Sequence, residues 1–136
     1  MINICEFCGT KFETNRKQKF CTPKCASEKR HIDAYHHFLN NNDEYCRGNY
    51  IPKNFRKFFL EEQNNVCAIC QSPPIHNGKE LIFIIDHIDG DASNNRRENL
   101  RLICPNCDSQ LDTYKSKNKN SKRRNYWKEK YAKKNK

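Results

Sequence analysis

Apolar residues occur in short groups separated by long polar stretches. The longest uninterrupted apolar run, LIFII at 81–85, predicts a buried strand. Leucine and isoleucine return at 100–103, where a second short strand is expected, and Pro105 fits the opening of a helix. Between the strands, Gly90 and the asparagines that follow it indicate a loop, in which Asp89 and Asp91 are expected to shape the turn.

Phenylalanines in the preceding segment recur at helical spacing. Phe55, Phe58 and Phe59 predict a helix over 54–63. Residues 31–66 read as mainly helical, with an interruption at 40–42 and a restart after Pro52. Near the C-terminus, Ser121 is placed to cap one further helix.

A pattern of this kind buries little apolar surface. Only 35% of the 136 residues are hydrophobic, and the mean hydropathy is −1.10. A chain so small and polar needs covalent or metal cross-links to hold a fold. Nine cysteines are available, and eight of them form close pairs: Cys5/Cys8, Cys21/Cys25, Cys67/Cys70 and Cys104/Cys107.

The cysteine spacing predicts metal ligands. The chain opens without a signal peptide and has no apolar run near the ~20 residues of a membrane span, so we expect a soluble, cytoplasmic protein. In that reducing compartment, close cysteine pairs favour metal sites over disulfides. We therefore expect two structural Zn²⁺ ions per chain, one for each set of four paired cysteines, and a free thiol at Cys46.

Positive charge is concentrated at the C-terminal end. The formal charge is +10, yet residues 1–114 contain fifteen basic and fifteen acidic residues, whereas residues 115–136 contain eleven basic residues and one acid. Such a tail favours a polyanionic partner. The basic residues that we expect to contact DNA, each with solvated surface charge as the alternative, are Lys17, Lys19, Arg96, Arg97, Arg101, Lys122, Arg123 and Arg124.

The order of motifs between and just beyond the last two cysteine pairs resembles a nuclease family. Asp86-His87 follows the first predicted strand, Asn99-Leu100 opens the second, and Asp108 follows the CPNC pair. Over roughly residues 53–118 this order resembles the HNH, or ββα-metal, endonucleases of phages, mobile elements and restriction systems. The resemblance implies a small, zinc-stabilised α+β fold: a ββα-metal core with an N-terminal four-cysteine zinc finger and flanking helices. The expected segments are a zinc module at 1–30, a helical connector at 31–66, the nuclease core at 67–118 and a basic tail at 119–136.

The resemblance also implies roles for individual residues. His87 would be the general base that activates water, Asp86 a ligand of a catalytic Mg²⁺ or Mn²⁺, and Asn99 the residue that holds the loop in shape. Most family members have histidine where this chain has Asp108. Since aspartate is a hard oxygen donor suited to Mg²⁺, we interpret Asp108 as a second ligand.

The implied function is hydrolysis of double-stranded DNA, leaving 5′-phosphate and 3′-hydroxyl ends. The alternative is a non-catalytic zinc protein that binds nucleic acid on a degenerate HNH scaffold. One active site cuts one strand, so double-strand cleavage needs either a homodimer or two sequential nicks.

Overall fold

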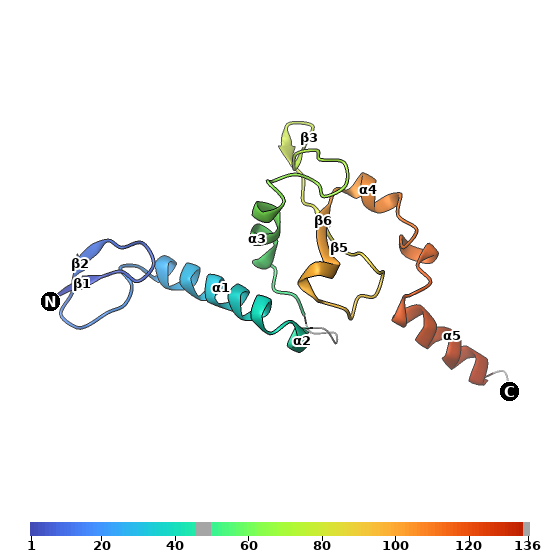
Figure 1. The fold of residues 1–136 in the computed structure, drawn as a ribbon, viewed down its shortest axis with the longest axis horizontal. Helices are drawn as coiled ribbons and strands as arrows, with labels where there is room; N and C mark the ends of the chain where they lie inside the picture. Colours follow the sequence, from blue (N-terminus) through green and yellow to red (C-terminus); the bar gives the residue numbers. More distant parts are fainter. Residues whose placement is uncertain (46–49, 135–136) are drawn as a thin grey trace. The chain divides into compact units, whose positions relative to one another are not determined.

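The computed structural model describes residues 1–45 and 50–134, and Cys46 lies outside them. Within these residues the fold is small and of the α+β class, as expected, with five α-helices and three two-stranded sheets (Figure 1). The chain divides into two compact units, Met1–Asn40 and Asn41–Lys136.

The first unit consists of a hairpin and a long helix. β1 (Ile2–Ile4) pairs antiparallel with β2 (Lys11–Glu13). The buried side chain of Asn3 fastens this hairpin, because its amide donates to Thr14 Oγ1 at 3.0 Å and its Oδ1 accepts from the Gln18 N–H at 3.1 Å. α1 (Pro23–Asn40) continues through residue 30, the expected end of the zinc module, and stops at Asn40, where an interruption was expected.

The second unit begins with two helices. α2 (Asn42–Tyr45) is short, and α3 (Phe55–Glu62) forms where the phenylalanine spacing predicts it. Gln63 follows α3, and its side chain bonds the backbone of β6 (Leu100–Ile103) twice: Nε2 donates to the Leu102 carbonyl at 2.9 Å, and Oε1 accepts from the Leu102 N–H at 2.8 Å. This pair of bonds fixes the end of α3 to the strand.

A small hairpin precedes the central one. β3 (Ile75–His76) pairs with β4 (Lys79–Glu80), and the connecting residues Asn77 and Gly78 have φ angles of 51° and 70°. Two consecutive positive φ angles define the hairpin turn that Asn-Gly favours. We did not predict this hairpin, although the Asn-Gly dipeptide was the available signal.

The central hairpin places the candidate site. β5 (Ile84–His87) pairs antiparallel with β6, with Ile84 opposite Ile103 and His87 opposite Leu100, and α4 (Pro105–Ser109) packs against β5 (Figure 1). The second strand and the helix opening at Pro105 are confirmed. The strand predicted at 81–85 was placed too early. β6 ends at Ile103 and the chain then enters α4, so residues 81–83 pair with none of the described strands.

The C-terminal segment forms the 3₁₀ turn η2 (Lys115–Lys117) and then α5 (Lys122–Lys134). The Ser121 hydroxyl accepts the Arg124 N–H at 3.3 Å, which confirms the expected cap. No residue of α5 in its described span is buried. No helix in the described parts of the chain combines the length and apolar character that a membrane crossing requires.

The core of the second unit is small. Its buried apolar side chains come from α3, from the segment before β5, from β6 and from the cysteine pairs. The aromatic and aliphatic members are Phe55, Phe59, Phe83, Leu100, Leu102 and Ile103.

Gly90, in the loop between β5 and β6, yields a stability prediction. It is buried with a φ of 74°, and an added Cβ would lie 2.7 Å from Asn118 Oδ1 and 2.8 Å from Thr113 Cγ2. Gly78 has a φ of 70° with nothing within 4 Å. Gly78→Ala should lower the free energy of unfolding by about 1 kcal/mol through backbone strain alone. Gly90→Ala should lower the free energy of unfolding by about 1–3 kcal/mol more than Gly78→Ala does, because the added methyl group also overpacks the loop.

Urea denaturation of the zinc-loaded variants measures both losses. Equal losses of unfolding free energy for the two variants would show that the side chains of Asn118 and Thr113 move away from the added methyl group at no cost. That result would contradict the close packing around Gly90.

Candidate functional site

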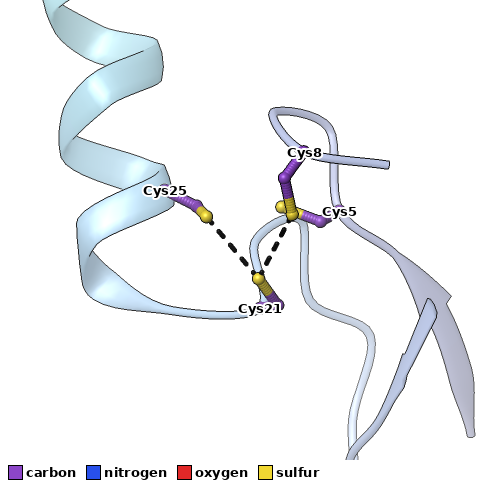
Figure 2. Close-up of side chains that lie close together, drawn as sticks. All are labelled: Cys5, Cys8, Cys21 and Cys25. Carbon is purple, nitrogen blue, oxygen red and sulfur yellow. Dashed lines mark hydrogen bonds between the residues drawn. The ribbon is translucent and has the colours of Figure 1, made fainter. Parts of the chain in front are cut away.

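Each unit contains one cluster of four cysteines. The four sulfurs of Cys5, Cys8, Cys21 and Cys25 lie within 4.8 Å of one another, as do those of Cys67, Cys70, Cys104 and Cys107. In Figure 2, Cys25 projects from the start of α1 toward Cys21, and Cys5 and Cys8 approach from the loop after β1. The Cys21 sulfur is 3.6 Å from the sulfurs of both Cys8 and Cys25.

These spacings fit zinc and exclude disulfides among the described cysteines. Zn–S bonds of about 2.3 Å in a tetrahedron put sulfurs about 3.8 Å apart, whereas a disulfide needs about 2.05 Å. In the second cluster the Cys70 and Cys104 sulfurs are 3.8 Å apart. None of the eight cysteines in the two clusters forms a disulfide. Both clusters are therefore compatible with structural zinc.

Two of the three CxxC pairs, Cys5/Cys8 and Cys67/Cys70, lie in loops with the same pattern of backbone hydrogen bonds. In the first, the Cys5 N–H donates to the Thr10 carbonyl and the Gly9 N–H donates to the Cys5 carbonyl, both at 3.0 Å. Gly9 has a positive φ, and the Thr10 hydroxyl lies 3.2 Å from the Cys8 sulfur. The second loop repeats these features at Cys67, Gln71, Ser72 and Cys70. The repeat indicates that both loops are shaped to present two sulfurs to one ion.

Charge within the second cluster also favours a cation. The hydrogen bond with the Ser72 hydroxyl lowers the pKa of the Cys70 thiol to about 6, whereas burial raises the pKa of the Cys107 thiol to about 12. Four adjacent thiols cannot all ionise without a counter-charge, and a bound Zn²⁺ supplies it. Cys104 also caps α4, whose N-terminal dipole favours negative charge.

Asp86 lies near the end of β5 and is buried, with 8% of its surface exposed. Its Oδ2 is 2.7 Å from Nε of Arg101, the residue directly opposite it in β6. A buried carboxylate needs a partner to remain charged, and Arg101 provides one. The pairing follows from strand register, because two residues directly opposite in an antiparallel pair share a face.

His87, the last residue of β5, is half-buried, and its Nε2 is 2.8 Å from Oδ1 of Asn95. Asn95 is 2% exposed, so the Asn95 side of this contact is shielded from solvent. An amide oxygen only accepts hydrogen bonds, so Nε2 is the donor in this contact, and in the neutral imidazole with that tautomer Nδ1 has the lone pair. The sequence indicates only that Asn95 lies in a loop, and nothing in the local pattern relates Asn95 to His87.

Asn99 joins the two ends of the loop. Its Nδ2 donates to Asp89 Oδ1 at 2.9 Å and to the Asn94 carbonyl at 2.8 Å, and its Oδ1 accepts the Asp89 N–H at 3.0 Å. Burial alone would raise the pKa of Asp89, but hydrogen bonds from Asn94, Asp91 and Asn99 lower it below its usual value. Asp89 and Asp91 shape the turn, as expected: each accepts the backbone N–H two residues further along.

Asp108 lies half-buried on α4, the helix that packs against β5. Asp86 and Asp108 therefore offer carboxylate oxygens, the donors that Mg²⁺ prefers, from elements in contact. Among the described residues, the cysteine clusters are the only groups that bring three or more ligand atoms within 4.8 Å, and Asp86, His87 and Asp108 do not form such a group. Mg²⁺ commonly binds one or two carboxylates and keeps several waters, so two donors fit this ion.

The three arginines expected to contact DNA form ion pairs within the second unit. The pairs are Arg96–Asp43, Arg97–Glu62 and Arg101–Asp86, with N–O distances of 2.6, 2.6 and 2.7 Å. Arg97 also lies over the Phe59 ring at 4.3 Å, and 20% of its side chain is exposed, so its contacts are structural. Arg96 pairs at the surface, where exchanging a carboxylate for a phosphate costs little.

The remaining basic residues lie in the two terminal segments. Lys17 and Lys19 line an open cavity of about 570 Å³ in the first unit, and Lys19 pairs with Glu6 at 3.5 Å. Lys122 pairs with Asp91 at 3.3 Å, beside the loop between β5 and β6. Arg123 and Arg124 are exposed in the first turn of α5.

Comparison with known proteins identifies the segment that carries the central hairpin. Residues 44–106 match the model of the HNH endonuclease family. Over this segment the chain is similar to the HNH endonuclease family. The matched segment includes Asp86, His87 and Asn99 and ends before Asp108, so the HNH match does not cover the last candidate ligand. No curated protein and no solved structure matches the chain.

Removing zinc should unfold the second unit, because the unit buries few apolar side chains apart from its cysteines. Metal analysis should find two zinc ions per chain in the wild type, one for each cluster. Cys107→Ser should lose the second ion and with it the ordered far-ultraviolet circular dichroism of the hairpin. Cys46→Ser is the matched control, because Cys46 stands outside the four close cysteine pairs of the sequence, and it should retain both ions. A chelated sample that keeps its full dichroism would contradict this dependence.

The Asp86–Arg101 pair should contribute to stability. Arg101→Gln leaves the Asp86 carboxylate buried without its partner and should lower the free energy of unfolding by about 1–3 kcal/mol. The double variant Asp86→Asn/Arg101→Gln should recover part of that loss, because no uncompensated charge remains. Denaturant midpoints of zinc-loaded protein provide the measurement.

Arg96→Gln is the control for this pair, since it removes an exposed arginine and should change stability by less than about 0.5 kcal/mol. If Arg101→Gln changes the free energy of unfolding no more than Arg96→Gln does, the buried Asp86–Arg101 pair does not stabilise the fold more than the exposed pair.

Proposed function

We propose that this protein is an endonuclease that hydrolyses phosphodiester bonds of double-stranded DNA at the β5–β6 hairpin. The observation that carries the proposal is the HNH family match over this hairpin, combined with a half-buried His87 whose Nε2 contacts a buried amide oxygen. The two zinc-compatible clusters supply the scaffold and leave the chemistry to the hairpin, because a closed four-cysteine site has no open position for substrate.

His87 is the proposed general base. Asn95 accepts the Nε2–H bond, so Nδ1 is the atom that takes a proton from water. As that proton moves to Nδ1, the water oxygen bonds to phosphorus and the bond from phosphorus to the 3′ oxygen breaks. The departing oxygen takes a proton from solvent, which leaves 5′-phosphate and 3′-hydroxyl ends.

Asp86 and Asp108 are the proposed ligands of one catalytic Mg²⁺ or Mn²⁺. The chemistry of such an ion, when bound, is to stabilise negative charge on the phosphate and on the leaving 3′ oxygen. Arg101 Nε lies 2.7 Å from Asp86 Oδ2 and provides a counter-charge for this buried side chain. Asn99 holds both ends of the loop and so keeps His87 and the residues after it in place.

DNA binding is proposed for Lys17, Lys19, Arg96, Arg97, Arg101, Lys122, Arg123 and Arg124. Arg97 and Arg101 have less exposed side chains than the other basic residues of this set that form ion pairs. The contacts of the whole set would be with the backbone, so affinity should fall steeply with salt. Cleavage of both strands would follow from a homodimer or from two sequential nicks, and a symmetric dimer would favour a palindromic target.

Nicking of supercoiled plasmid in the presence of Mg²⁺ or Mn²⁺ tests the proposal. His87→Ala should reduce the cleavage rate by about 10²–10⁴-fold, the usual contribution of a general base, while DNA binding persists. His76→Ala is the matched control, because His76 is exposed in the small β3–β4 hairpin, and it should cleave like the wild type. Asn95→Asp should move the acidic limb of the pH–rate profile to higher pH, since an added negative charge favours the imidazolium form.

A zinc-loaded wild type that binds DNA and cuts no DNA form with either ion would instead identify a non-catalytic nucleic-acid-binding protein. An RNA substrate in the same assay distinguishes a nuclease directed at RNA.

A further inference from the structure

A basic cavity lies between η2 and the start of α5. It has a volume of about 400 Å³ and is lined by Lys117, Lys119, Arg124, Asn125 and Lys128. Among the described residues that line it, four are cationic and none is acidic. Arg124 and Lys128 are one helical turn apart on α5, and Lys117 and Lys119 form the opposite wall. Like charges at this helical spacing are mildly destabilising, so the arrangement favours an anion between them.

The segment that forms one wall of this cavity also contacts the HNH hairpin. We call residues 117–122 the strap. Asn118 Nδ2 donates to the Gly90 carbonyl and Asn120 Nδ2 donates to the Asp89 carbonyl, both at 2.8 Å. Lys122 Nζ bonds the Ser93 hydroxyl and pairs with Asp91. The strap is therefore bonded at three successive even-numbered positions to the loop that follows His87.

Residues of the strap alternate between two tasks. The odd-numbered Lys117 and Lys119 line the cavity, while the even-numbered Asn118, Asn120 and Lys122 hold the loop. The contact with Gly90 is close, since an added Cβ there would meet Asn118 Oδ1 at 2.7 Å. The Gly90 N–H in turn donates to the His87 carbonyl at 2.8 Å. A short bonded path thus links the cavity wall to the proposed base.

We propose that this cavity binds a backbone phosphate of the DNA at a distance from the scissile one, and that the strap sets the register between the two. The inference rests on the proposed function. A guanidinium can engage two oxygens of a phosphate while lysines add point charges, and neither reads the base. The cavity would thus fix which phosphate reaches His87 without specifying sequence.

Phosphate chemistry alone also fits inorganic phosphate or a phospholipid headgroup. DNA is favoured because the strap is bonded to a loop of the segment that is similar to the HNH endonuclease family. Because the cavity is connected to the hairpin, one extended ligand such as DNA can contact both of them, whereas a single phosphate or headgroup cannot.

The first test measures DNA affinity across a salt series, in a His87→Ala background without added Mg²⁺ or Mn²⁺. Arg124→Gln/Lys128→Gln should reduce the slope of log K against log salt by about 0.9, the value for one phosphate contact. Lys117→Gln/Lys119→Gln, on the opposite wall, should do the same. Lys133→Gln/Lys134→Gln removes equal charge from the same helix outside the cavity and should leave the slope near the wild-type value.

Equal slopes in the cavity and control variants would overturn the site in favour of diffuse attraction by the tail. So would binding of inorganic phosphate, or of phosphatidylglycerol vesicles, that only the cavity variants lose while their DNA affinity and salt slope stay at the wild-type values. All substituted side chains are exposed, and glutamine is a good helix former, so the fold should persist; circular dichroism verifies this.

The second test addresses register. Asn118→Ala/Asn120→Ala keeps the four cations but removes two bonds to the loop. It should bind DNA with the wild-type salt slope, yet spread cleavage of an end-labelled duplex over neighbouring phosphates. An unchanged cleavage pattern would overturn the registering role. If the wild type does not cleave, the proposed function fails, while the salt series still decides whether the cavity binds DNA.

Discussion

The four-sulfur cluster of the second unit is the constraint on which the candidate site depends. Cys67 and Cys70 precede the hairpin, and Cys104 and Cys107 follow it, so one ion would tie both ends. The strands β5 and β6 have four residues each and form only a two-stranded sheet, which is marginal by itself in water. A shared ion replaces the missing core and lets a short hairpin hold a buried Asp86.

Features governed by local chemistry were predictable from the sequence. Cysteine spacing indicated both clusters, phenylalanine spacing indicated α3, and the serine cap indicated the start of α5. The first strand was misplaced because its limits depend on its partner. Five apolar residues suggest a strand, but β6 ends opposite Ile84, so the pairing begins there and includes Asp86 and His87.

The residue types of the candidate site were predictable, whereas their partners were not. Arg101 meets Asp86 only because of strand register, and Asn95 meets His87 because the intervening loop turns back on itself. That loop depends on Asn99, whose three bonds connect residues five and ten positions apart. Such contacts follow no period in the sequence. The resemblance to HNH endonucleases indicated Asn99, but no local signal indicated Asn95.

The charges that can attract a polyanion lie mainly in a different segment from the proposed catalytic residues. Arg96, Arg97 and Arg101 already have acidic partners, so the hairpin has little positive charge left to attract a polyanion. Residues 115–136 contain eleven basic residues and one acid, so this C-terminal tail has a large excess of positive charge. Because the strap bonds that tail to the loop after His87, an anion attracted by the tail would arrive beside the hairpin. The attraction of DNA and the proposed cleavage can thus lie on separate segments that are joined by the hydrogen bonds of the strap.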